Sequence, residues 1–563
     1  TNKGVSTNTM GLYTIDVANT GVTLVFSFVG YESQEAVAVH TAIINVVLKQ
    51  LASNLNEAVV VGYGVQKRVN VIGAVATIDG RDLENRQVTN LSAALTGLAS
   101  GVYVHQTTGR PGYDGASITV RGLGTTNNTS PLVVIDGIVG SMDAVNPNDV
   151  ESISVLKDAA TAAIYGSLAS NGVILITTKK GARNKTTVRY STLLSKSKPN
   201  NLPKFESDYV RAMQLVNEGY TNIGQAAVYT DATMDLWRKA AANPDGLNDI
   251  GVPNYVAYPN TNWGKVLFNV HTPMQNHNLS LNGGNEASQF LLSANYMNNP
   301  GTIVNTGATR YGLRINLQSK LSKFLTVGTQ TFGDMQKFGV NDLATAFNYL
   351  TASVPGLYPY YNGNYGFPAA AEESATANNP LSWLYSQGGG NTLSRINSTV
   401  FANLSLMKGL SFESKVHYDN SATEGRLFTQ PYSKVNFATG VVGAAAVSSS
   451  QLTTQYSFSK SYNVILDEVL RYQTVIAERH AIGVLAGYNQ QYFNTYNYNA
   501  QKLGLTDPTL TTLNAANTVT SATGDEADFA MQSYFGQINY TYKDRYIFQA
   551  VAREDGSSRF SSS

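Results

Sequence analysis

From about Thr186 onward, the sequence consists of segments of roughly ten residues in which apolar and polar side chains alternate. In RYGLRINLQSK, Arg310–Lys320, the odd-numbered positions from Tyr311 to Leu317 are apolar, and the even-numbered positions are polar or glycine. Alternate side chains of a strand point to opposite faces, so each segment predicts a strand with one apolar face. The same register recurs in Ser288–Asn298, Ser398–Tyr418 and Ser533–Arg553. This pattern is typical of a transmembrane antiparallel β-barrel, whose apolar side chains face lipid and whose polar side chains face a wet lumen.

A soluble all-β sandwich or solenoid is the alternative fold, because its strands also alternate. Two features favour the barrel: Lys and Asp fall at turns such as Lys543-Asp544, and the faces expected to point outward carry Leu, Ile, Tyr and Phe. We expect short turns such as this one and Met407–Gly409 on the periplasmic side, and the long loops outside the cell. No run of about 18 apolar residues occurs, so no membrane-spanning helix is expected.

The preceding region, Arg68–Lys180, has a different texture, with short strands, short helices and many glycines. LSAALTGLASGVYV predicts a helix with Leu91, Leu95 and Leu98 on one face, ended by Gly101 before a strand. Farther on, VESISVLKD, AATAAIYG and GVILITTKK predict a strand, a short helix and a buried strand. The apolar faces of this α+β unit are narrow, so we expect a barrel wall to cover them.

Composition and motifs exclude several functions. The 39 basic and 38 acidic residues leave a net charge of +1, which gives no electrostatic footprint for nucleic acid. There is no cysteine, and the six histidines are scattered. The nearest pair, His271 and His277, has no carboxylate or cysteine between its members. We therefore expect neither a metal site nor another cofactor. No nucleophile elbow or other catalytic constellation occurs, and we expect no enzyme activity. The Asp136-Gly137 and Asp114-Gly115 pairs are expected to be turns.

The first 50 residues alternate in TLVFSFVG and in INVVL, Ile44–Leu48, which predicts part of a small β-sandwich. The run NEAVVVGYG, Asn56–Gly64, is a short β-branched stretch bounded by glycine. It predicts either an ordinary edge strand or an exposed, unpaired strand that another protein captures through main-chain hydrogen bonds.

The run PLVVIDGIVG, followed by NPNDVESISVLKDAATAAIYGS and NGVILITTKKG within Pro131–Gly181, resembles the plug signature of the SusC/RagA family of TonB-dependent outer-membrane transporters. LSAALTGLASGVYVHQTTGRPG and ITVRGLGTTNNTSPL continue the resemblance upstream, and DGSSRF continues it downstream. The resemblance implies that the plug signature comprises Asp136, Gly137, Asp149, Lys157, Asp158, Tyr165, Gly166, Asn171 and Gly172.

The implied fold is an α+β plug inside a transmembrane antiparallel β-barrel, preceded by part of a small β-sandwich. We expect a partial carboxypeptidase-regulatory-like domain at 1–50, a TonB-box linker at 51–66, the plug at 67–182 and barrel strands at 183–563. Only ten to twelve strands are recognisable after Thr186, against about 22 in plugged transporters, so the barrel is expected to be incomplete and the chain to be cut at both ends.

The resemblance also implies a function, which is active import of a large nutrient, an oligosaccharide or a peptide, across the outer membrane of a Gram-negative, Bacteroidetes-like cell. The implied partners are the C-terminal domain of TonB, a SusD-like surface lipoprotein, the ligand and outer-membrane lipid. The residues expected to bind TonB are Glu57, Ala58, Val59, Val60, Val61, Gly62 and Tyr63. The alternative is a passive plugged porin or a surface adhesin without energy coupling.

Three residues depart from the family pattern. Asn56 and Ala58 stand where the family has Asp and Val, which removes one charge and two methyl groups from the expected TonB box. Leu168 stands where the family commonly has Arg, so an ion pair that ties the plug to its surroundings is expected to be missing there. The sequence contains no signal that identifies the ligand-binding residues.

Overall fold

The computed structural model describes residues 4–8, 11–17, 21–27, 33–38, 43–48, 58–61, 64–67, 74–84, 86, 88–125, 128–183, 186–269, 271–339, 342–368, 370, 378–443, 449–543 and 545–560. The chain forms two compact units, Thr1–Val71 and Ile72–Ser563.

The first unit contains two small antiparallel sheets. Strand β1 (Thr23–Phe26) pairs with β2 (Gln34–Val37), and β3 (Ala58–Val61) pairs with β4 (Gly64–Lys67). The ring of Tyr13 packs edge-on against Phe26, with 5.3 Å between centroids. The alternation in Ile44–Leu48 predicts a third strand, and this is wrong, because residues 43–48 have no sheet partner within the described ranges. The backbone there is anchored by a different contact, a hydrogen bond of 3.0 Å from the Tyr13 hydroxyl to the carbonyl oxygen of Ile44.

The second unit begins with a plug built on a five-stranded sheet. Its order is β5 (Val75–Asp79), β10 (Val150–Leu156), β11 (Val173–Thr178), β8 (Leu132–Ile135) and β9 (Ile138–Val139). Only β8 and β11 run parallel. The other elements are α1 (Gly80–Glu84), α2 (Leu91–Ala94), the hairpin of β6 (Val102–His105) and β7 (Ser117–Val120), the 3-10 turns η3 (Met142–Ala144) and η4 (Pro147–Asp149), α3 (Ala159–Ala162) and η5 (Ala163–Ala169).

The core of the plug includes one side chain from outside the plug. Leu91 of α2 and Leu95, its C-cap, are buried together with Ile153 and Ile174 of the central strands, although the helix is a single turn and does not extend to Gly101 as predicted. Phe332, which lies on a wall strand, belongs to the same cluster. The wall therefore contributes to the apolar core of the plug at this point, which is the kind of contact that the narrow apolar faces predicted.

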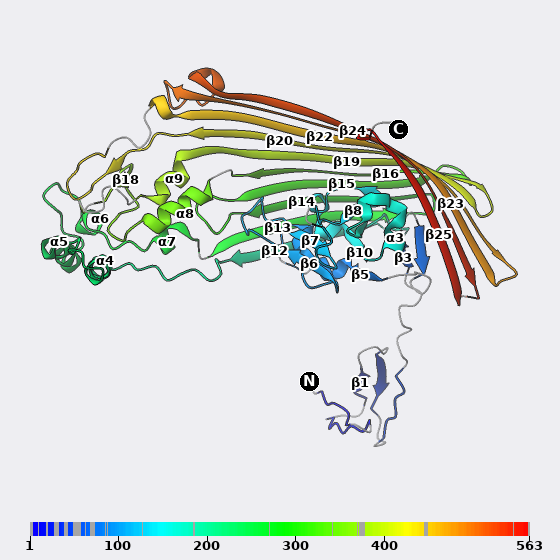
Figure 1. Cartoon of the computed structure of the whole chain (residues 1–563). Helices are drawn as coiled ribbons and strands as arrows, with labels where there is room; N and C mark the ends of the chain where they lie inside the picture. The colour runs from blue at the N-terminus through cyan, green and yellow to red at the C-terminus, as the bar shows by residue number, and fades with distance from the viewer. Residues whose placement is uncertain are drawn as a thin grey trace. The chain divides into compact units, whose positions relative to one another are not determined.

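The wall is one antiparallel sheet of 11 strands in sequence order (Figure 1). The strands are β12 (Thr187–Ser197), β13 (Thr272–Gly284), β14 (Ser288–Asn299), β15 (Ala308–Lys320), β16 (Leu325–Phe338), β19 (Gln387–Met407), β20 (Leu410–Thr429), β22 (Thr453–Ile476), β23 (His480–Leu505), β24 (Ala516–Tyr542) and β25 (Tyr546–Ser557). Among the described residues β12 and β25 do not pair with each other, so the wall is open, and both the strand number and the open wall match the sequence prediction.

The faces of the wall follow the predicted alternation. On β15, Tyr311, Leu313 and Leu317 are exposed on the outer face, whereas Arg310 and Arg314 are buried on the inner face. The inner face is polar because it must pair with the plug, and the outer face is apolar because lipid cannot solvate charge.

Short and long connections lie at opposite ends of the wall. Tight turns join β13 to β14, β15 to β16, β19 to β20, β22 to β23 and β24 to β25. The long connections carry α4 (Tyr209–Asn222), α5 (Asp231–Ala242), α6 (Asn254–Ala257), α7 (Trp263–Leu267), α8 (Leu343–Ala352), α9 (Pro380–Ser386) and a small sheet of β17 (Tyr360–Tyr361), β18 (Asn364–Gly366) and β21 (Lys434–Val435). No helix within the described ranges is long and apolar enough to cross a membrane.

The close approach of α1 to β10 gives a test of plug packing. A Cβ at Gly80 would overlap the carbonyl oxygen of Val150, which is backbone and has little freedom to move. We expect Gly80→Ala to destabilise the plug by about 2 kcal/mol. Urea-dependent amide hydrogen exchange of β10 in the full chain measures this. Gly109→Ala is the matched control, because no atom lies within 4 Å of its added Cβ, and an equal effect of both changes would contradict the packing argument.

Candidate functional site

The plug meets the wall in a buried polar node around Asp149, which ends η4. The carboxylate of Asp149 accepts a hydrogen bond from the Ser293 hydroxyl of β14 at 2.8 Å and pairs with Nε of Arg314 on β15 at 3.1 Å. Arg314 also donates from Nη1 to the hydroxyl of Thr178, at the end of β11, at 3.2 Å. Asp149 and Arg314 are both buried, so each supplies the partner that the other requires away from water.

Asp136 connects this node to the hairpin of β8 and β9. Asp136 (φ 51°) and Gly137 (φ 94°) both lie in the left-handed region, as a two-residue hairpin turn requires, so the predicted turn is confirmed. The carboxylate of Asp136 accepts hydrogen bonds from the backbone N–H of Thr178 at 2.9 Å and from its hydroxyl at 2.6 Å. The structure thus joins Asp136 and Asp149 of the plug signature through Thr178 and Arg314.

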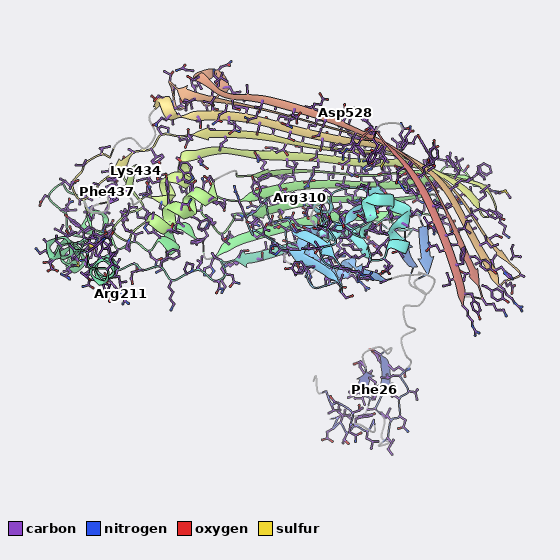
Figure 2. The ribbon with its side chains drawn as sticks, viewed as in Figure 1. Phe26, Arg211, Arg310, Lys434, Phe437 and Asp528 are labelled. Atoms are coloured by element: carbon purple, nitrogen blue, oxygen red, sulfur yellow. The ribbon has the colours of Figure 1, made fainter. Side chains whose placement is uncertain are left out.

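Two further arginines of the wall bind the carbonyl oxygens of the η3 turn. Arg310 of β15 and Arg395 of β19 both pair with Asp334 of β16, at 3.2 Å and 2.8 Å. Arg310 donates to the carbonyl oxygen of Ala144 at 2.8 Å, and Arg395 donates to that of Asp143 at 3.4 Å. Figure 2 marks Arg310 where β15 passes the plug. The shared carboxylate holds both guanidinium groups in place for the plug backbone.

A second anchor joins η5 to the last two strands of the wall. Arg553 of β25 donates from Nη1 to the carbonyl oxygen of Ile164 at 3.0 Å and pairs through Nε with Asp555 at 2.7 Å. The hydroxyl of Ser533 on β24 donates to Asp555 at 2.5 Å. Gly166 lies beside this group with φ 69°, and a Cβ there would be 2.6 Å from Oδ2 of Asp555. Glycine is therefore required at this point of the signature.

The side chain of Leu168 is half exposed, and leucine has no charge with which to form the ion pair of the family pattern. Arg553 of the wall anchors η5 through the carbonyl oxygen of Ile164. Tyr165, in the same turn, is buried, and burial raises the pKa of its hydroxyl.

The remaining signature residues hold the plug together internally. Asn171 donates from Nδ2 to the carbonyl oxygen of Asn128 at 2.8 Å. Gly172 has φ 89°, and a Cβ added there would lie 3.0 Å from the carbonyl oxygen of Leu156. Lys157 donates to the backbone of Ser100. Asp158 accepts a hydrogen bond from the backbone N–H of Ala74, the residue that precedes β5.

The residues expected to bind TonB lie partly outside the described residues, which exclude Glu57, Gly62 and Tyr63. Ala58–Val61 form β3 and pair antiparallel with β4, with Val60 opposite Val65. This pairing agrees with the predicted edge strand and not with the alternative, an unpaired strand. Among the described residues, β3 and β4 form a sheet of two strands, so no further strand lies along the other edge of β3.

Aromatic side chains gather in the long connections. Tyr360 and Tyr365 are 4.9 Å apart between ring centroids, and Tyr365 meets Tyr432 edge-on at 5.8 Å. Burial and the neighbouring tyrosines raise the pKa of Tyr365 to about 12. Lys434 and Phe437 lie in the same region (Figure 2). Within the described ranges, no cluster of His, Asp and Glu side chains suits a metal ion.

The sequence did not predict which wall residues hold the plug at Asp149 and at η5. Alternation places Arg310 and Arg314 on the polar face of one strand, four residues apart, which was the available signal. It does not reveal which carbonyl or carboxylate of the plug they meet, because that depends on pairing across the fold. Arg553 and Asp555 bracket the start of the DGSSRF run but carry no local signal of a plug contact.

The Asp149 node gives a second test. Arg314→Met leaves the Asp149 carboxylate buried without its ion-pair partner, so we expect the plug to lose about 3–5 kcal/mol of stability. The double variant D149N/R314M removes both charges and should recover most of the loss. Protease accessibility and amide exchange of β10 and β11 in the inserted protein provide the measurement, and a double variant as unstable as the single one would contradict the pairing.

Comparisons with known proteins agree with this architecture. Residues 67–173 match the family model of the TonB-dependent receptor plug domain. The chain is 32% identical over 99% of its length to TonB-dependent receptor P26 of Formosa agariphila, of which it covers 54%. It is 27% identical over 97% of its length to TonB-dependent receptor SusC of Bacteroides thetaiotaomicron, of which it covers 53%.

A solved structure of the RagAB peptide importer in an open-open state shares the fold, with a TM-score of 0.75 and 23% identity over 90% of this chain and 57% of that one. The chain spans about half the length of the curated relatives that it matches. Residues 67–173 are thus a TonB-dependent receptor plug domain, and over nearly its whole length the chain is similar to outer-membrane receptors of the SusC/RagA type.

Proposed function

We propose that this protein imports a large nutrient, an oligosaccharide or a peptide, across the outer membrane by TonB-dependent displacement of its plug. The observation that carries the proposal is the polar character of the contact between plug and wall. The plug is held by a few nodes of charges and carbonyl oxygens, around Arg314, Arg310 and Arg553. Such nodes can exchange their partners for water, so departure of the plug from the wall exposes little apolar surface apart from the contact with Phe332.

We propose that β3 is the segment that the C-terminal domain of TonB binds. Strand addition uses main-chain hydrogen bonds, so it tolerates the Asn56 and Ala58 departures from the family pattern. In a two-stranded sheet, β3 keeps one edge for a further strand.

A SusD-like surface lipoprotein is proposed as the partner at the loop end. The solved neighbour is described as a peptide importer, RagAB, which supports a large ligand for this chain as well. Tyr360, Tyr385 and Tyr255 of the long connections are exposed. Exposed tyrosines suit both the stacking of sugar rings and the docking of a protein, because each offers a rigid apolar ring with a polar tip.

A passive plugged porin or adhesin is the second candidate. The pairing of β3 with β4 favours it, because the segment is already part of a sheet and is not the unpaired strand expected for capture by TonB. Energy coupling distinguishes the two functions.

Coupling is tested by changing β3. Deleting Glu57–Tyr63 should abolish both TonB binding and uptake while the barrel still inserts. Val60→Pro should act in the same direction, because proline removes a backbone N–H and is poorly tolerated in a paired strand. Val60→Ala keeps the N–H and should retain most of the binding. The measurements are pull-down by the purified C-terminal domain of TonB and uptake by cells that carry the full-length protein, and unchanged uptake after the deletion would establish the passive function.

The ligand class is tested on purified protein. We expect binding of either an oligosaccharide pool or a peptide pool, measured by native mass spectrometry, with no cleavage products. Tyr360→Ala should weaken that binding about fivefold through loss of one aromatic contact. Leu123→Ala, a change of an exposed plug side chain, is the control. Cleavage fragments would contradict the transport function.

A further inference from the structure

Ala74 is the place where the N-terminal segment enters the plug. It directly precedes β5, which is an edge strand of the plug sheet and pairs only with β10. If β3 is pulled, as the proposed function requires, the tension passes along the chain to Ala74 before it reaches any other described residue of the second unit. The contacts of Ala74 therefore decide how firmly the plug resists.

Both main-chain groups of Ala74 are held by one pair of neighbouring residues. The carbonyl oxygen of Ala74 accepts a hydrogen bond from the backbone N–H of Lys157 at 3.2 Å. The backbone N–H of Ala74 donates to Oδ2 of Asp158. The other carboxylate oxygen of Asp158 pairs with Nη1 of Arg121 at 2.5 Å. The bond from Lys157 is the last main-chain hydrogen bond between β5 and β10, and the carboxylate of Asp158 adds one more after it.

Asp158 also stands at a position from which its carboxylate could cap α3, but it does not do so. Asp158 is the N-cap residue of α3, with the extended backbone that a cap has (φ −106°, ψ 145°), but its side chain makes no hydrogen bond to α3. The longer helices behave differently, since the N-cap side chains of α4, α5 and α8 each accept from a backbone N–H of their own helix. Aspartate is a favourable cap, so its diversion to Ala74 costs α3 that stabilisation.

Arg121 is positioned for this contact by an unusual backbone. It follows β7 with φ 58°, a conformation that residues other than glycine rarely adopt. Its backbone N–H donates to the carbonyl oxygen of Gly101 at 2.8 Å, which fixes the turn. The hydrogen bond from Ala74 and the Arg121 guanidinium both lower the pKa of the Asp158 carboxyl, so the group is charged at neutral pH.

We propose that Asp158, oriented by Arg121, is a clip that fastens the start of β5 and is the first contact to open when the preceding segment is pulled. Once open, the carboxylate is in place to cap α3, which stabilises the released state. The clip rests on the proposed function only for its purpose, because its contacts exist without TonB.

Amide hydrogen exchange on the full chain in detergent tests the clip directly. Asp158→Ala should accelerate exchange at residues 74–77 about tenfold, as the loss of one charge-assisted hydrogen bond predicts, with β11 unchanged. Arg121→Ala should act on the same amides more weakly. Glu151→Ala is the matched control, because it removes an exposed carboxylate from the other end of β10. If Asp158→Ala accelerated exchange in 160–162 and not in 74–77, Asp158 would be an ordinary helix cap and the proposal would be overturned.

A pulling experiment tests the order of opening. The chain has no cysteine, so Lys67→Cys provides an unambiguous attachment point for force spectroscopy of the membrane-inserted protein. Asp158→Ala should lower the first rupture force and leave later plug-unfolding events unchanged, whereas an equal shift of all events would show general destabilisation and overturn the clip. Neither measurement uses TonB. If the tests of energy coupling showed that TonB does not bind β3, these two measurements would still decide whether Asp158 fastens the start of β5.

Discussion

Each strand of the wall must satisfy two environments at once, and the paired charges that line its inner face are the interaction on which the rest of the structure depends. Lipid accepts only apolar outer side chains, so the arginines at the level of the plug, Arg310, Arg314 and Arg395, are directed inward, where the plug excludes water. Arg314 and Arg310 would be untenable there without Asp149, Asp334 and the plug carbonyl oxygens. The plug is thus both the obstruction of the lumen and the counter-charge of its lining.

These contacts differ in kind. The Asp149 node is a buried ion pair supported by two hydroxyl groups, whereas the Arg553 anchor binds a single backbone carbonyl oxygen of η5. At the entry of the N-terminal segment, Asp158 makes a partly exposed contact, which water can replace more easily than it can the buried pairs. The plug is therefore fastened most firmly at its sheet and least firmly where the chain enters it, which is the distribution that the proposed displacement of the plug requires.

The sequence determined the layers of this fold more completely than its contacts. Alternation alone assigned Tyr311 and Arg310 to opposite faces of β15, because a period of two is a local property of a strand. The Asp136-Gly137 turn was predictable for the same reason. The partner of Asp158 was not, since a cap residue before a helix signals the helix and not the distant amide of Ala74. The return of β4 onto β3 also escaped prediction, because GVQK lacks the apolar alternation of a strand.

Phe332 has a consequence for biogenesis. A plug whose core includes a ring from β16, with the Arg314 guanidinium 4.8 Å above that ring, lacks a packing partner until that strand is in place. The plug is translated before the strand that completes it, so its final compaction awaits the assembly of the wall. Folding of the plug and insertion of the strands are then one coupled event, and the lumen is sealed by the same step that forms it.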